Sequence, residues 1–80
     1  MTKQDGVDIW EAVIRDRLIN GNRNGFKLDS VVKKLRRVKF GRGGKMKTTR
    51  PDGRVDRNFI YAWNHFPSLI KEFLKRTGDA

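Results

Sequence analysis

Cysteine is absent from this sequence, histidine occurs once, and proline occurs only twice in 80 residues. Without cysteine, the chain can form neither a disulfide framework nor a thiolate metal site. No apolar run approaches the roughly 20 residues that a membrane-spanning helix needs, and no basic-then-apolar signal peptide opens the chain. We therefore expect an intracellular, cytoplasmic protein that does not use a membrane as its partner.

Acidic residues are also scarce, and the resulting positive charge is concentrated in one part of the chain. The sequence has 19 Lys and Arg against 9 Asp and Glu, a net charge of +10. Residues 1–22 carry a net charge of −1 and residues 58–80 carry +1, so residues 23–57 hold the remaining +10. A field of one sign on one stretch attracts polyanions, which indicates a nucleic-acid partner. The alternative, charge that only keeps a small domain soluble, does not require such clustering.

Two segments have clear helical signals near the ends of the chain. Residues 8–19 are predicted to be helical, because Asp8 and Glu11 have capping-box spacing and Gly21 supplies a stop within an Asn- and Gly-rich turn at residues 20–25. A last helix is predicted from Pro67 to the stop at Gly78. Each segment has apolar residues at steps of three and four: Val7, Trp10, Val13, Ile14 and Leu18 in the first, and Phe66, Leu69, Ile70, Phe73 and Leu74 in the last.

A further helix, capped by Asp29 or Ser30, is predicted to be apolar on one face and cationic on the other. The apolar stripe comprises Leu28, Val31, Val32, Leu35 and Val38, and the intervening cations are Lys33, Lys34, Arg36, Arg37 and Lys39. Like charges at this spacing repel one another, and a facing polyanion relieves the repulsion. This helix is therefore a candidate nucleic-acid contact, with an ordinary solvated face as the alternative.

The segment Phe40-Gly-Arg-Gly-Gly-Lys45 is too rich in glycine for a helix. It predicts a mobile or tightly turning basic loop, from which Arg42 and Lys45 project. Such a loop lets the backbone approach a phosphate or enter a groove. The alternative is a plain connection between a helix and a hairpin.

Residues 45–61 are predicted to form a basic β-hairpin. Arg50-Pro-Asp-Gly53 is a strong turn signal, and Val55, Arg57, Phe59 and Tyr61 then alternate with other residues as in a strand. The same residues admit another interpretation, a short helix capped by Asn58 and running to His65. We favour a strand to about Tyr61.

A domain this small needs most of its aromatic residues in its core. The expected core comprises Trp10, Ile14, Leu18, Val31, Leu35, Phe59, Trp63, Leu69, Ile70 and Phe73. On this expectation Trp63→Ala removes about 3–5 kcal/mol of stability. Tyr61 and Phe40 border the basic stretch and are the expected exceptions, free to stack on bases.

Residue constellations for catalysis or metal binding are few. A metal site with His65 and no cysteine would need several carboxylates. Acid–base catalysis by His65, near Asn64 and Tyr61, would be similar to that of small toxin-type ribonucleases, but a packed or surface histidine is the commoner arrangement. We expect no enzymatic activity, no metal and no cofactor.

The predicted order of helix, helix, basic hairpin and helix is an α+β fold in a single nucleic-acid-binding domain over residues 1–80. Residues 1–6 and 78–80 are expected to fray, and residues 40–46 form the Gly-rich loop. The layout resembles a winged-helix domain of the size found in small phage and plasmid regulators and excisionase-type proteins, except that a helix follows the hairpin. An all-helical arrangement is the alternative.

This layout implies a small DNA-binding regulator or architectural factor, associated with the nucleoid, that contacts duplex DNA through its basic helix and hairpin. The predicted contact residues are Lys33, Lys34, Arg36, Arg37, Lys39, Arg42, Lys45, Lys47, Arg50, Arg54 and Arg57. If about six of them neutralise phosphates, log K falls with log salt at a slope near −5. Arg36→Ala and Arg54→Ala are expected to weaken binding without unfolding. The alternatives are an RNA-binding or ribosome-associated protein and, beyond that, a small nuclease or a protein-binding effector.

Overall fold

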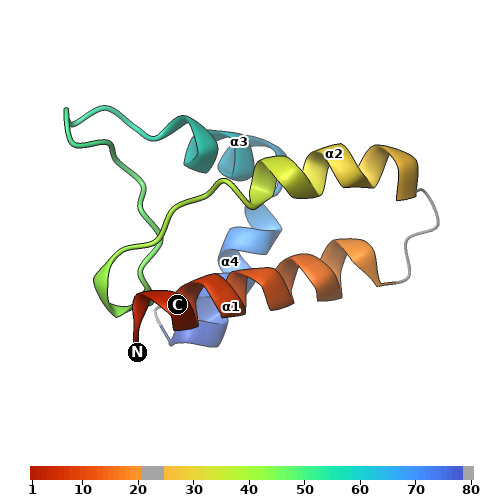
Figure 1. Cartoon of the computed structure of the whole chain (residues 1–80), viewed down its shortest axis with the longest axis horizontal. Coiled ribbons are helices and arrows are strands. Elements are labelled where there is room, and N and C mark those ends of the chain that lie inside the picture. The colour runs from red at the N-terminus through yellow and green to blue at the C-terminus, as the bar shows by residue number, and fades with distance from the viewer. Residues whose placement is uncertain (21–24, 79–80) are drawn as a thin grey trace.

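The computed structural model describes residues 1–20 and 25–78, and helices account for nearly all of its regular structure (Figure 1). The α-helices are α1 (Lys3–Ile14), α2 (Gly25–Leu35), α3 (Arg57–His65) and α4 (Pro67–Thr77). A π-helical turn, η1 (Arg15–Ile19), extends α1, and a 3-10 turn, η2 (Arg42–Gly44), lies in the long connection between α2 and α3. Helix α1 packs against α4 and η2, and α3 packs against both α2 and α4.

The α+β prediction is wrong, because the described residues contain no strand or sheet and have the all-helical arrangement instead. Of the hairpin predicted over residues 45–61, one isolated antiparallel bridge between Thr49 and Val55 is present, and a second bridge, between Phe40 and Met46, closes the Gly-rich loop. The tight turn itself is present, since the Gly53 amide donates to the Arg50 carbonyl over 2.9 Å and Gly53 has a φ of 86°. With no hairpin, the winged-helix layout does not describe this chain.

The segment predicted as the second strand is α3, and its cap explains why. The Asp56 carboxylate accepts hydrogen bonds from the amides of Asn58 and Phe59, at 2.8 and 3.2 Å. These bonds satisfy two amides of the first helical turn, which a strand would have left to a partner strand. The helical alternative had placed the cap at Asn58, two residues too late. The apolar alternation from Val55 to Tyr61 was therefore a weaker signal than the acidic cap.

The core lies where α1, α4 and the end of α2 meet. The Trp10 ring lies edge-on to Phe73 with 6.0 Å between centroids, and its indole N–H donates to the Leu35 carbonyl over 2.9 Å. Phe40 also packs on Phe73, so the expectation that Phe40 borders the basic surface in an exposed position is wrong. The buried hydrophobic residues are Trp10, Val13, Ile14, Val32, Leu35, Val38, Phe40, Ala62, Leu69, Ile70 and Phe73.

One predicted core residue lies on the surface. Trp63 is 46% exposed, whereas Leu18, Val31 and Phe59 are partly buried against the core. Because residues 57–65 are helical, Ala62 takes the inward position and the next side chain turns outward. The large stability loss expected for Trp63→Ala does not follow from this exposed position.

The helix limits differ from the predicted ones at two places. Helix α1 begins at Lys3, because the Thr2 hydroxyl accepts from the Asp5 amide over 3.2 Å and the Asp5 carboxylate accepts from the Thr2 amide over 2.8 Å. This reciprocal capping box precedes the one predicted at Asp8. Helix α2 begins at Gly25, ahead of the predicted caps, and residues 21–24 of the predicted turn lie outside the described residues. The limits of α4, from Pro67 to a left-handed Gly78 cap, are confirmed.

The Gly-rich loop is docked on the start of α1. A side-chain carbon added at Gly6 would lie 2.5 Å from the Gly44 carbonyl oxygen and 2.8 Å from the Gly44 Cα. Gly44 has a φ of 76°, which favours glycine for a second reason. Two glycines that are 38 residues apart in the numbering therefore allow a backbone-to-backbone contact that holds the Gly-rich loop against α1.

Candidate nucleic-acid interface

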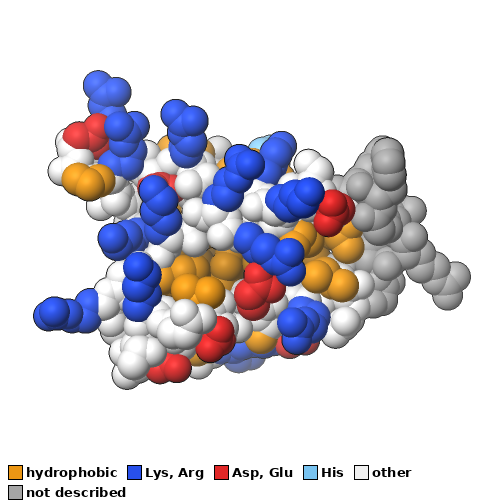
Figure 2. Space-filling model, in the orientation of Figure 1, with side chains coloured by type: hydrophobic (Ala, Val, Ile, Leu, Met, Phe, Trp, Pro, Cys, Tyr) orange, Lys and Arg blue, Asp and Glu red, His pale blue; other side chains and the backbone are white. Residues whose placement is uncertain are grey.

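Lys and Arg side chains gather over α2 and the α2–α3 connection on the face shown in Figure 2. All eleven predicted contact residues are exposed. Three of them pair with carboxylates: Lys33 with Asp29 at 3.5 Å, Arg50 with Asp52 at 3.0 Å, and Arg36 with Glu11. The other eight have no ion pair within residues 1–20 and 25–78: Lys34, Arg37, Lys39, Arg42, Lys45, Lys47, Arg54 and Arg57.

Arg36 is the most strongly engaged of the paired cations. Its Nε donates to Glu11 Oε1 over 2.6 Å and its Nη2 donates to Glu11 Oε2 over 3.3 Å. The Glu11 hydrogen bond, and then the Glu11 charge, raise the pKa of the Arg36 guanidinium. This two-point contact joins α1 to the residue that follows α2 and uses two of the five guanidinium N–H donors. Arg36 is thus a structural link between the two helices as well as a predicted DNA contact.

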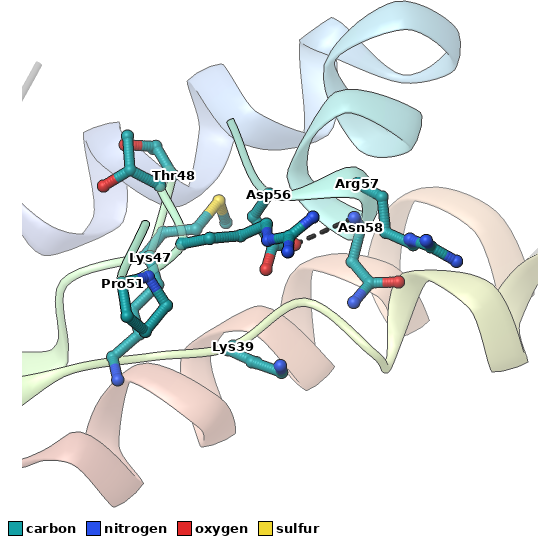
Figure 3. Close-up of a pocket in the computed structure, with 10 residues that line it drawn as sticks. Lys39, Lys47, Thr48, Pro51, Asp56, Arg57 and Asn58 are labelled. Carbon is teal, nitrogen blue, oxygen red and sulfur yellow. Dashed lines mark hydrogen bonds between the residues drawn. The ribbon is translucent and has the colours of Figure 1, made fainter. Parts of the chain in front are cut away.

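A cleft of about 760 Å³ opens between the α2–α3 connection and the start of α3 (Figure 3). We call it the basic cleft. It is lined by Lys39, Met46, Lys47, Thr48, Thr49, Arg50, Pro51, Asp56, Arg57 and Asn58. Four of these residues are cations and one is a carboxylate, so the cleft is strongly positive.

Backbone hydrogen bonds bring the walls of the basic cleft together. The Lys47 amide donates to the Lys39 carbonyl over 2.8 Å, and the Asp56 amide donates to the Thr48 carbonyl over 2.9 Å. Lys39, Lys47 and Arg57 therefore come from three chain segments that lie side by side. Four like charges held in this way repel one another, and an anion in the cleft would relieve the repulsion.

Asp56 is the buried polar residue at the base of the cleft, with 5% of its surface exposed. Figure 3 shows its carboxylate between the two lysines, Lys39 and Lys47, and the start of α3, where it accepts a hydrogen bond from the Asn58 amide. Since Asp56 already satisfies the first amides of α3, the helix end is not an open anion site. The attraction for an anion comes from Lys39, Lys47, Arg50 and Arg57.

Several residues of the cleft were not predicted from the sequence. Thr48, Thr49 and Asn58 line the cleft with polar groups suited to hydrogen bonds with phosphate oxygens. Only the position of Asp56, one residue ahead of a possible helix, was a readable signal for this end of the cleft. The polar side chains themselves carry no pattern that marks them in the sequence.

His65 and Tyr61 lie outside the lining of the basic cleft. The His65 ring is exposed and packs at 4.8 Å from the Tyr61 ring, over which Lys34 Nζ lies at 5.3 Å. Across the described part of the chain, no group of three or more His, Cys, Asp or Glu is placed to hold a metal ion. None of the described helices is long and apolar enough to cross a membrane.

Comparison of the chain with protein-family models, with curated proteins and with solved structures gives no match.

Proposed function

We propose that this protein binds duplex DNA through its phosphate backbone, with the basic cleft as the centre of the contact surface. The observation that carries the proposal is the set of cations around the cleft without carboxylate partners in the described structure: Lys39, Lys47 and Arg57, with Arg50 paired only to the exposed Asp52. Cations in this arrangement release condensed counterions from a polyanion, which is the main source of sequence-independent affinity for DNA.

The strength of this interaction can be stated as a salt dependence. Lys45 and Arg54 flank the cleft in the same connection and add two exposed cations to its four. Six phosphate contacts give a slope of about −5 for log K against log salt concentration. Each cation removed is expected to reduce the slope by about 1 and to weaken binding similarly on all sequences.

The contacts in this proposal hold the protein on the DNA and carry no sequence information by themselves. The role is that of a small transcriptional regulator or architectural factor of the phage or plasmid type, acting in the cytoplasm on nucleoid DNA. The all-helical fold moves the expected contact from a recognition helix to the α2–α3 connection. Lys34 near the end of α2 and Arg37 just after the helix add two exposed cations, whereas Arg36 is paired with Glu11.

The test is a salt series of fluorescence-anisotropy titrations with one labelled duplex DNA, one single-stranded DNA and one hairpin RNA. We expect the duplex to bind most tightly, with a slope of several units. A preference for the RNA would overturn the DNA assignment and favour the RNA-binding alternative. Weak binding that does not depend on salt would mean that the basic cleft faces a protein.

A further inference from the structure

An apolar pocket of about 390 Å³ adjoins the basic cleft. It is lined by Lys45, Met46, Thr48, Phe59, Trp63, Ile70, Phe73 and Leu74. Met46 and Thr48 also line the basic cleft, so the two hollows share a wall. Seven of the eight lining residues are uncharged, and the remaining one is a lysine, which makes the pocket apolar inside and positive in charge.

Two aromatic rings form a flat surface in this pocket. Phe59 and Trp63, four residues apart on α3, lie 15° from parallel with 6.3 Å between centroids. Trp63 is 46% exposed, although the other tryptophan, Trp10, is only 2% exposed. A large exposed indole that is already stacked on one ring is suited to extend the stack with another flat group.

We propose that this pocket binds an unpaired base of a DNA strand whose phosphates lie in the basic cleft. The inference rests on the proposed function and makes it more specific: the preferred ligand is a duplex with a short single-stranded extension. Base–aromatic stacking does not depend on sequence, because every base has a π face. Lys45 supplies a cation for the phosphate of the same nucleotide, and the shared Met46–Thr48 wall keeps base and backbone within one nucleotide's reach.

Charge complementarity selects this occupant over a second copy of the chain. Each copy carries a net charge of +10, so two copies meeting at a pocket beside the basic cleft would repel each other. The described lining of the pocket contains no carboxylate that could pair with Lys45. A nucleotide brings a flat ring that can stack on Trp63 and a phosphate that can pair with the cations of the cleft.

The test compares three labelled duplexes with the unaltered protein: one blunt, one with a thymidine overhang, and one with an abasic overhang of equal length and equal phosphate charge. We expect the thymidine overhang to bind about tenfold more tightly than the abasic one. Trp63→Ala should remove this difference, and Trp63→Phe should keep part of it. Ile60→Ala is the matched control, because Ile60 is 40% exposed on the same helix and does not line the pocket.

Tryptophan fluorescence provides a second readout. Emission from Trp63 should be quenched by the thymidine overhang and not by the abasic one, and Trp63→Phe, which leaves only buried Trp10, should abolish the quenching. Equal affinity for both overhangs, with salt-dependent binding of the blunt duplex, would overturn the base pocket and leave the proposed function intact. Loss of salt-dependent binding to all three duplexes would overturn both.

Discussion

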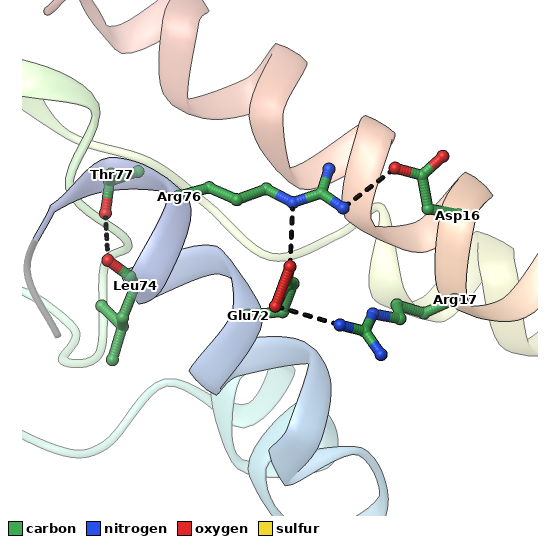
Figure 4. A network of polar contacts seen from close by, with 6 residues as sticks. All are labelled: Asp16, Arg17, Glu72, Leu74, Arg76 and Thr77. Atoms are coloured by element: carbon green, nitrogen blue, oxygen red, sulfur yellow. Dashed lines mark hydrogen bonds and ion pairs between the residues drawn. The ribbon is translucent and has the colours of Figure 1, made fainter.

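Two polar surfaces of this protein differ in how their charges are balanced. The first lies between α4 and the α1–η1 segment, where acidic and basic side chains alternate in one network (Figure 4). We call it the paired cluster, and it comprises Asp16, Arg17, Glu72 and Arg76. Arg76 contacts Asp16 at 2.9 Å and Glu72 at 3.3 Å, and Arg17 contacts Glu72 at 3.1 Å. Two cations meet two carboxylates, so the cluster has no net charge.

The second surface is the basic cleft, where four cations surround one carboxylate that is already bonded to the backbone of α3. Both surfaces join segments distant in sequence, but only in the paired cluster are the charges balanced within the protein. The excess positive charge is thus not balanced in the same way over the whole surface. In the basic cleft, backbone hydrogen bonds hold the segments of Lys39, Lys47 and Arg57 together, and these three cations have no carboxylate partner in the described structure.

The largest expected effect is on binding, from the triple variant Lys39→Ala, Lys47→Ala and Arg57→Ala. Losing three contacts worth about 1 kcal/mol each should weaken duplex binding roughly a hundredfold and lower the salt slope by about 3. Anisotropy titrations measure both quantities.

The control for this variant removes the same charge elsewhere. Lys3→Ala, Lys71→Ala and Lys75→Ala take away three exposed cations from α1 and α4, outside the cleft lining. If the control weakens binding as much as the cleft variant, net charge alone would explain the affinity, and the contrast between the two surfaces would fail.

Gly6→Ala is expected to have the next largest effect, on the stability of the fold. Alanine in a helix normally stabilises it, by roughly 0.5–1 kcal/mol relative to glycine. Here the added carbon meets the Gly44 backbone at 2.5 Å, and such overpacking costs about 1–3 kcal/mol. The sign should therefore reverse, and urea denaturation should show a less stable protein. Gly43→Ala, where no atom lies within 4 Å, tests positive φ without the clash.

Arg57→Ala and Arg36→Ala compare the loss of an unpaired cation with the loss of a paired one. Arg57 has no ion pair in the described structure and should lose about fivefold in duplex affinity when truncated. Arg36 is already held by Glu11, so its truncation should change binding less and lower stability by under about 1 kcal/mol. Paired titrations and thermal melts separate the two effects. Equal losses of affinity would show that Arg36 leaves Glu11 to contact DNA.

The smallest effect concerns the pH dependence of the paired cluster. The hydrogen bond from Arg76, followed by the charge of Arg17, lowers the pKa of Glu72 in the folded protein. A carboxyl group with a lowered pKa contributes stability above its unfolded pKa, about 4.3 for glutamate, and this stability is lost as the pH falls through the folded pKa. The Tm of the parent should therefore fall below about pH 4 more steeply than that of Glu72→Gln. Parallel curves of Tm against pH for the two proteins would show that Glu72 does not cause the loss of stability at low pH.

Part of the fold was readable from local patterns. The three- and four-residue spacing around Trp10 and Phe73 identified faces that the structure buries, and Pro67 and Gly78 marked α4 correctly. Alternation from Val55 to Tyr61 led to a strand that does not exist, because an alternating pattern in a short segment also fits a helix once Asp56 caps it. The predicted burial of Trp63 was wrong for the same reason, because the helical period, in place of the strand period, turns its side chain outward.

The sequence predicted the positive charge of the candidate site but not its shape. The eleven cations were identified from the sequence, but the pairing of Arg36 with Glu11 depends on a contact across 25 residues. Thr48, Thr49 and Asn58 became cleft residues only because the connection folds back on itself.

By itself, the sequence determined the charge of the middle stretch, the absence of thiol chemistry and the apolar faces of the main helices, because these properties depend on residue type and local spacing. Only the tertiary structure decided which cations stand unpaired in the basic cleft and that Trp63 is exposed beside it. The cleft depends on backbone hydrogen bonds between segments that are separate in the sequence, and the place of Trp63 beside the cleft depends on the packing of α3, which no local pattern encodes.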